Sequence, residues 1–345
     1  MDVGDVVVQG DAPAEGAQVT ACAGLGLSNT MGPMPTFGVS DVSQWIVHGE
    51  EPLGSKEKDW MRPNSTGDLW LFKLRRENSG EDWAEKVAEQ LAATIRLPHA
   101  KVELATRDGR RGIISRDFRV LPYGSSGRFV PGNELMWRAD TSYQKEKRRR
   151  LSQYTVERSL NLIAGLDVHP PRSGIGHDET LTAATCFVGY LMFDAWIGNL
   201  DRHHENWGAI QHVVQGEHSV LILAPSFDHA ASLGHNETDE RRERRLATND
   251  SRGTIDVWAR SGNRSCFYRE GEPKACRPIE AFDTACRAYP EAGQFWLRRL
   301  DAVDSEAQER VLSCVPSTLL SSIGRRFTLR LLDIYRQDLL TRLLR

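Results

Sequence analysis

The sequence has little net charge and no long uninterrupted apolar run. Its 345 residues contain 44 Lys and Arg against 47 Asp and Glu, a formal charge of −3. This balance provides no general positive field to hold a polyanion, so nucleic acid is not expected as a partner. The most apolar window, Leu181 to Leu200, is interrupted by Asp194, Gly198 and Asn199. It falls short of a bilayer span, so we expect a buried helix there and no membrane partner.

Paired cysteines and internal repeats are also missing. The six cysteines form no C-x-x-C pair, and the start MDVGDVVVQGDAPAEG has neither the basic nor the apolar region of a signal peptide. We therefore expect reduced thiols and a cytoplasmic protein. A composition of 40% hydrophobic and 26% charged residues excludes a wholly disordered chain. The length fits one two-lobed domain or two packed domains.

The N-terminal part of the chain predicts a flexible arm followed by a small sheet with one helix. Residues 1–40 are rich in small residues and Pro and have little periodicity, which is typical of a flexible arm. QWIVHG and DLWLFKLR are predicted strands, and LGSKEKDW between them is a predicted polar loop. AKVELAT and RRGIISRDF are two more strands, joined by the hairpin signal Asp108-Gly109. A helix is predicted over 81–95, with four apolar residues on one face: Trp83, Val87, Leu91 and Ile95.

Beyond Phe118 the sequence turns to longer helical segments. These are expected at 154–166, at 179–197 and from Pro278 to the end, with breaks at Pro290 and Pro316. The interpretation is a β-rich lobe over 41–118 and a mostly α lobe over 119–345. Two charge-dense stretches, 141–155 and 236–250, are expected to be solvated linkers or helix faces.

A lysine and a glutamate in the first lobe form one candidate pair. Lys73 lies at the end of a predicted strand and Glu85 lies early in the following helix. Such a lysine can neutralise phosphate oxygens while the glutamate holds its ammonium group. In the loop before it, Gly54, Ser55 and Lys58 offer backbone N–H groups and positive charge to phosphates, although the loop does not have the Walker pattern.

The strongest chemical signal is the segment NLDRHHEN, residues 199–206, between an apolar helix and the predicted strand WGAI. Asp201 and Asn206 have the spacing of the protein-kinase catalytic loop, in which the Asp orients the attacking hydroxyl and the Asn holds Mg²⁺. Asp228 follows a second predicted strand and offers Mg²⁺ a carboxylate. Zinc is not expected at His203 and His204, because adjacent histidines point in divergent directions.

Any one of these residues alone could be a turn, cap or surface residue. The ordered set in matching local contexts favours a site for phosphoryl transfer: Lys73, Glu85, Asp201, Asn206 and Asp228.

The chain resembles the HipA-like family of bacterial serine/threonine kinases. The resemblance lies in LGSKEKDW, WLFK, EDWAEKVAEQLA, FDAWIGNLDRHHENWG and LAPSFDHAASLG, and the family signature I-G-N-x-D-R-H-x-x-N is present over 197–206. It implies an α+β, two-lobed protein-kinase-like fold. It also implies roles for individual residues: Asp201 as catalytic base, Asn206 and Asp228 as metal ligands, Lys73 on the nucleotide phosphates and Lys58 as the phosphate-loop lysine.

The implied activity is an ATP- and Mg²⁺-dependent transfer of the γ-phosphate to Ser or Thr hydroxyls of protein, including autophosphorylation. Candidate self-modification sites are Thr238, Thr248 and Ser251 in the position of an activation loop, and Ser55 in the phosphate loop. A phosphotransferase acting on a small molecule or lipid, and a non-catalytic regulator that binds nucleotide, are alternatives. A third is an interaction protein that works through its basic stretch Lys145–Arg150.

Toxin members of the family carry an extra N-terminal domain and are held by a DNA-binding antitoxin. Here about forty residues precede the expected core, which matches a stand-alone short form better. An antitoxin-like regulator is retained as a candidate partner.

Overall fold

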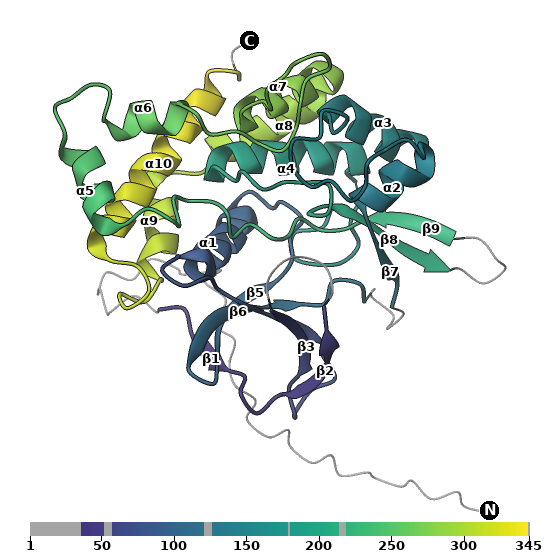
Figure 1. The fold of residues 1–345 in the computed structure, drawn as a ribbon, viewed down its shortest axis with the longest axis horizontal. Helices are drawn as coiled ribbons and strands as arrows, with labels where there is room; N and C mark the ends of the chain where they lie inside the picture. The colour runs from purple at the N-terminus through teal and green to yellow at the C-terminus, as the bar shows by residue number, and fades with distance from the viewer. Residues whose placement is uncertain (1–35, 52–56, 121–125, 179, 214–218, 344–345) are drawn as a thin grey trace, which may run out of the picture. The chain divides into compact units, whose positions relative to one another are not determined.

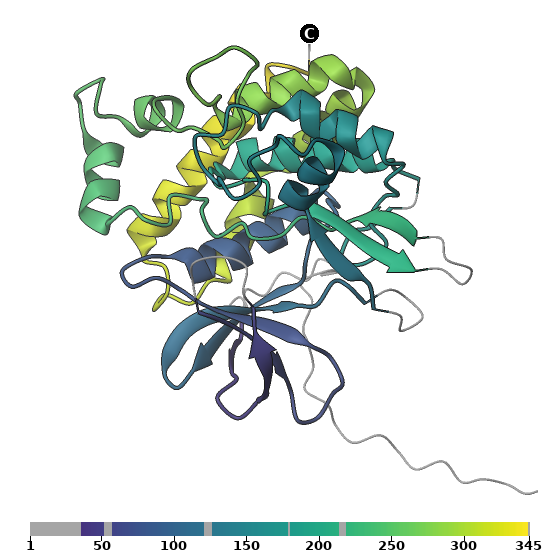
Figure 2. The same cartoon turned by 45° about the vertical axis from the view of Figure 1, so that its right-hand side comes forward.

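The computed structural model describes part of the chain, and all structural statements concern this part: residues 36–51, 57–120, 126–178, 180–213 and 219–343. These residues form an N-terminal lobe built on a sheet and a larger, mostly helical lobe, as predicted (Figure 1). The α+β class expected from the sequence is confirmed. In both views the N-terminal sheet lies on one side of α1 and most of the other helices lie on its far side (Figures 1 and 2).

The N-terminal sheet has the strand order β1-β5-β6-β4-β3-β2, with β1 parallel to β5 and the other neighbours antiparallel. Its strands are β1 (Val39–Asp41), β2 (Ile46–Glu50), β3 (Lys58–Arg62), β4 (Trp70–Leu74), β5 (Val102–Arg107) and β6 (Arg110–Arg116). A second, antiparallel sheet in the helical lobe has the order β7-β8-β9. Its strands are β7 (Arg128–Pro131), β8 (Gly208–Val213) and β9 (Ser219–Leu223).

The helical lobe is organised around α4 (Ala183–Ile197), in which every residue except Thr185 is buried. This confirms the predicted buried helix. Helix α4 contacts four others of its lobe, α3 (Val156–Gly165), α7 (Pro278–Ala288), α8 (Pro290–Asp301) and α10 (Ser322–Leu340). The remaining helices are α1 (Glu81–Thr94), α2 (Gly132–Ala139), α5 (Asp239–Ala247), α6 (Ile255–Arg260) and α9 (Ser305–Ser313). No helix among the described residues is both long enough and apolar enough to span a bilayer.

Helix α1 belongs to the N-terminal lobe by sequence and to the main core by packing. Its predicted apolar face is confirmed, since Trp83, Val87, Leu91 and Ile95 are each at most 2% exposed and pack in the same cluster as α4. The helix also contacts β5, β6 and α9. A residue on α1 is therefore fixed relative to both lobes.

The predicted hairpin between β5 and β6 is confirmed. Arg107 pairs with Arg110, which leaves Asp108 and Gly109 as a two-residue turn. Their φ angles are 50° and 74°. Two positive φ angles are the requirement of the type I′ turn that Asp-Gly favours.

Two predicted boundaries differ from the structure. The arm was expected to extend to residue 40, but β1 begins at Val39, and its three exposed residues carry no apolar alternation that would reveal a strand. They are ordered by parallel pairing with the distant β5. The expected loop LGSKEKDW is a strand from Lys58 onward, because Met61 of β3 fills the core of the sheet. Strand β7 was not predicted, since it is stabilised by pairing with β8, far along the chain. Helix α2, which follows it directly, was not predicted either.

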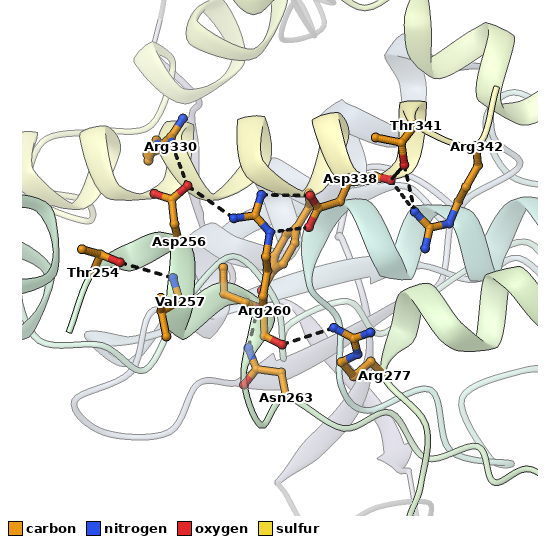
Figure 3. Close-up of polar contacts among 12 residues, drawn as sticks. Thr254, Asp256, Val257, Arg260, Asn263, Arg277, Arg330, Asp338, Thr341 and Arg342 are labelled. Carbon is orange, nitrogen blue, oxygen red and sulfur yellow. Dashed lines mark hydrogen bonds and ion pairs between the residues drawn. The ribbon is translucent and has the colours of Figure 1, made fainter. Parts of the chain in front are cut away.

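The segment that follows Asp228 is partly helical and is fixed to α10. Thr238 caps α5 by accepting a hydrogen bond from the Arg241 N–H, and Thr248 ends this helix. In α6, Arg260 forms a bidentate ion pair with Asp338 of α10, with Nε–Oδ2 at 2.8 Å and Nη2–Oδ1 at 2.9 Å (Figure 3). Autophosphorylation at Thr238, Thr248 and Ser251 stays a prediction.

The turn after α4 generates a stability prediction. Gly198 ends α4 at φ 66°, and an added Cβ would lie 2.7 Å from the ring of Tyr335. Gly198→Ala should therefore lower the free energy of unfolding by about 1–2 kcal/mol, measured by urea unfolding. The control is Gly165→Ala at the end of α3, where an added Cβ meets no atom within 4 Å. A Gly198→Ala protein as stable as this control would contradict the strain argument.

Candidate active site

Lys73 faces the space between the lobes because of its place on β4. Side chains alternate along a strand, so Phe72 packs in the core of the sheet while Leu71 and Lys73 line the cavity. The Lys73 Nζ lies 3.4 Å from Oε1 of Glu85 on α1 and 3.2 Å from Oδ1 of Asp228. Burial opposes the charge of Lys73, but the carboxylates of Asp228 and Glu85 outweigh burial and raise the pKa of its ammonium group.

The loop after α4 is shaped by hydrogen bonds from its two asparagines. Asn199 Nδ2 donates to Asp194 Oδ1 at 2.8 Å, and Asn199 Oδ1 accepts from the Asp201 N–H at 3.1 Å. Asn206 Nδ2 donates to the Asp201 carbonyl at 2.7 Å. These bonds fix the backbone of Asp201 and leave its carboxylate 35% exposed, with Arg149 Nη2 3.8 Å from its Oδ1.

Arg202 connects this loop to the segment before Asp228. The residue is 2% exposed and forms a bidentate pair with Asp194, with Nε–Oδ2 and Nη2–Oδ1 both at 2.8 Å. Its guanidinium also donates to the carbonyls of Asn206 at 2.8 Å and Phe227 at 3.4 Å, and to Ser226 Oγ at 2.9 Å. One buried cation thus holds α4, the Asp201 loop and the Asp228 segment together.

Asn206 and Asp228 line the same cavity and have the donor chemistry of a Mg²⁺ site. Because the Asn206 amide nitrogen is engaged by the Asp201 carbonyl, the atom it can offer to a cation is the amide oxygen. Asp228 has φ 59°, in the left-handed region that few residues other than glycine adopt and that occurs in turns and at functional sites. Mg²⁺ takes few protein ligands and completes its shell with phosphate and water, so this pair fits it.

The two adjacent histidines occupy different environments. Their ring centroids are 6.3 Å apart and their ring planes are at 90°. His204 is buried and its Nδ1 lies 2.8 Å from the Tyr143 hydroxyl, while His203 lines the cavity. Burial, aided by the neighbouring His203, lowers the pKa of His204 to about 4. Burial also lowers the pKa of His203 and of the fully buried His229.

Three cavities adjoin one another along the cleft. The first has about 790 Å³ of space, open solvent included, and an aromatic floor in which Phe118, Phe129 and Phe227 lie with ring centroids 5.3–5.8 Å apart. We call it the aromatic cavity. The second, the polar cavity, shares with it Lys58, Lys73, His203 and Asp228, and also reaches Asp201.

The third cavity, the outer groove, begins where the polar cavity ends. The two share four lining residues: Arg76, Arg149, Asp201 and Ala231. Asp201 therefore lies at the border between the polar cavity and the outer groove.

The structure brings together six of the residues singled out in the sequence: Lys58, Lys73, Glu85, Asp201, Asn206 and Asp228. Lys58 lies directly opposite Lys73 in the register of β3 and β4, and both side chains line the aromatic and polar cavities. Gly54 and Ser55 lie outside the described residues.

Sequence reasoning missed the arginines of the stretch Lys145–Arg150 as part of the site. Arg148 pairs with Glu205 at 2.7 Å and Arg149 approaches Asp201. The only signal was the density of positive charge, which also occurs in solvated linkers. The aromatic floor was missed as well, because its three rings come from separate segments and have no common periodicity.

A β-rich lobe that presents a buried Lys–Glu pair to an Asp-Asn loop in a helical lobe is the architecture of protein-kinase folds. Comparison with solved structures shows which kind of protein-kinase fold this is. The chain is similar to the proinflammatory kinase CtkA of Helicobacter pylori, with a TM-score of 0.67 and 16% identity over 89% of this chain and 99% of that one. It is also similar to HipA in the HipA–HipB–operator DNA complex of Shewanella oneidensis, with a TM-score of 0.50 and 11% identity over 87% of this chain and 66% of that one.

At these identities the similarity shows the fold, which is the HipA-like kinase fold expected from the sequence. No protein-family model matches the sequence, and the search of curated proteins finds no match.

The Arg202 network generates a second stability prediction. Arg202→Met leaves the buried Asp194 carboxylate without its cation, so the free energy of unfolding should fall by about 3–5 kcal/mol in denaturant unfolding. Arg252→Met is the control, since the Arg252 side chain is 91% exposed and its replacement should change stability by less than about 0.5 kcal/mol. Equal stability of the two variants would show that the network does not support the fold.

The buried histidines predict acid sensitivity. They titrate near pH 6.5 in the unfolded chain, but their pKa is depressed in the fold, to about 4 for His204. The contribution of these neutral histidines to the free energy of unfolding is therefore fully present above pH 6.5. It is lost as the pH falls toward 4, by up to about 1.4 kcal/mol per pH unit for each such group. Thermal unfolding between pH 7.5 and about 4.5 measures this loss. His204→Gln should make the decline shallower, and an unchanged slope would exclude His204 as a cause.

Proposed function

We propose that the protein is an ATP- and Mg²⁺-dependent kinase that phosphorylates Ser or Thr hydroxyls of protein. The observation that carries the proposal is the order of the three cavities. The aromatic cavity suits a nucleobase, the polar cavity with its lysines and Asp228 suits phosphates, and Asp201 stands where the polar cavity meets the outer groove. Nucleotide and acceptor can therefore approach Asp201 from opposite sides.

In this proposal the protein contributes mainly position and charge, which is what phosphoryl transfer requires. Lys73, held by Glu85, binds nucleotide phosphate oxygens, and Lys58 across the β3–β4 pair supplies a second cation. Asn206 and Asp228 would hold Mg²⁺, which neutralises phosphate charge when bound. Asp201 orients the acceptor hydroxyl and accepts its proton at the carboxylate.

Asp228 has to change partners in this scheme. In the structure its carboxylate lies 3.2 Å from Lys73, and both groups are expected to bind elsewhere once nucleotide and metal are present. The ion pair keeps the two charges compensated in the free protein. We infer that nucleotide binding exchanges this internal pair for contacts to phosphate and metal.

The nature of the acceptor rests on the outer groove, which offers about 1950 Å³ of space, open solvent included, beside Asp201. An open groove of this size favours a polypeptide acceptor over a small molecule. The neighbours suggest the wider setting: CtkA is described as a proinflammatory kinase, and HipA was solved with HipB in a toxin–antitoxin system. An antitoxin-like regulator stays a candidate partner of this chain.

The test is intact mass, with phosphosite mapping, after incubation with Mg²⁺, ATP and a protein extract. Wild type should add phosphate to Ser or Thr, on itself or on extract proteins. Asp201→Asn should lose at least about a hundredfold of that rate, because the general base is gone while the shape of the side chain is kept. Asp228→Asn should lose transfer and also the extra thermal stabilisation that Mg²⁺ adds to bound nucleotide.

Asp301→Asn is the matched control, an exposed carboxylate at the end of α8 that should keep wild-type transfer. Equal transfer by wild type and Asp201→Asn would remove Asp201 from the reaction. If wild type is stabilised by nucleotide but transfers no phosphate, the alternative of a nucleotide-binding regulator replaces the kinase.

A further inference from the structure

The outer groove has a strong excess of positive charge. Five Arg and Lys side chains line it: Arg76, Arg149, Arg150, Arg264 and Lys274. Among the described lining residues the only carboxylates are Asp201 and Glu272. The whole chain has a formal charge of −3, so this excess is local to the groove.

These cations come from separate parts of the chain and line one groove. Arg76 follows β4, Arg149 and Arg150 lie in the loop before α3, and Arg264 and Lys274 lie between α6 and α7. The positive charge of the groove therefore comes from three distant segments and not from one charge-rich stretch. This arrangement places these positive charges in the same groove as Asp201.

Three of these five charges are available to a ligand: Arg149, Arg150 and Lys274. The Arg149 side chain is 83% exposed, and its 3.8 Å contact with the partly exposed Asp201 is a surface contact that exchanges readily. The Arg76 side chain is 62% exposed, but the buried carboxylate of Glu81 holds it at 2.8 Å. Within the part of the chain that the structure describes, Arg150 and Lys274 form no ion pair and both are exposed. An anion bound by Arg149, Arg150 and Lys274 would therefore not have to displace a buried partner.

We propose that the outer groove binds acceptor polypeptides in which acidic residues flank the phosphorylated Ser or Thr. The inference rests on the kinase function proposed above and specifies its substrate class. Carboxylates on either side of the acceptor residue would pair with the groove's arginines and lysines while the acceptor hydroxyl meets Asp201. Acceptors with basic flanks would be repelled by the same groove.

The lining favours a peptide over a nucleic acid. Single-stranded nucleic acids are held by aromatic platforms on which successive bases stack, and the described lining of the groove contains only Tyr268 and the imidazole of His235 as aromatic rings. Its other lining side chains include small and apolar ones such as Leu200, Ala231 and Pro273, which leave room for an extended backbone.

The experiment uses the full chain and three synthetic peptides that share one central Ser and carry acidic, neutral or basic flanks. The readout is kcat/KM for phosphate transfer at low and at high salt. Each exposed ion pair contributes modestly, so two or three together should favour the acidic over the neutral peptide by about tenfold. The preference should shrink at high salt, where exposed charges are screened.

The variant Arg150→Glu with Lys274→Glu should invert the order, so that the basic peptide becomes the better acceptor. The matched control, Arg298→Glu with Arg326→Glu, makes the same change of charge at exposed arginines outside the groove and should keep the wild-type order. Nucleotide-induced thermal stabilisation checks that both double variants are folded.

The outcomes separate this inference from the function on which it rests. Asp201-dependent transfer without an acidic preference, or with the same preference in both double variants, overturns the groove proposal and leaves the kinase proposal intact. Transfer that ignores peptide charge but is inhibited by single-stranded RNA through Arg150 and Lys274 overturns it in favour of nucleic acid. No transfer to any acceptor overturns both.

Discussion

The ion pair between Arg202 and Asp194 is the interaction on which the site depends. A buried guanidinium is stable only when its donors are satisfied, and here they bind one carboxylate, two backbone carbonyls and one hydroxyl. These acceptors belong to three segments, namely α4, the Asp201 loop and the segment before Asp228, so satisfying Arg202 positions all three. The hydrogen bonds that keep the buried Arg202 charge stable therefore also fix the positions of Asp201, Asn206 and Asp228.

Helix α1 performs the corresponding task for the other lobe. Its apolar face is part of the main core, while Glu85 on the same helix holds Lys73 of the sheet. Packing therefore fixes the distance between the sheet and the helical lobe through one element. Because Lys73 contacts both Glu85 and Asp228, the two lobes are held together by ion pairs as well as by packing.

The sequence alone was informative wherever a residue's role is local. The α1 face and the Asp108-Gly109 turn follow from short-range pattern, and both match the structure. The Asp201-to-Asn206 spacing is local as well, and in the structure Asn206 donates to the Asp201 carbonyl, while the catalytic role of the pair stays a prediction. Strand β1 and the aromatic floor depend on partners far along the chain, so no local pattern marks them. The stretch Lys145–Arg150 was ambiguous because charge density does not reveal which surface it faces.

The outer groove and the Arg202 network differ in how freely they can change. Arg150 and Lys274 are exposed loop residues outside the core, so replacing them costs little folding free energy. Arg202 and Asp194 are buried, and losing either leaves a charge without its partner. The scaffold thus separates a surface that tolerates mutation from a centre that does not. Over evolutionary time, a protein built this way can acquire new binding preferences at its groove without rebuilding the residues around Asp201.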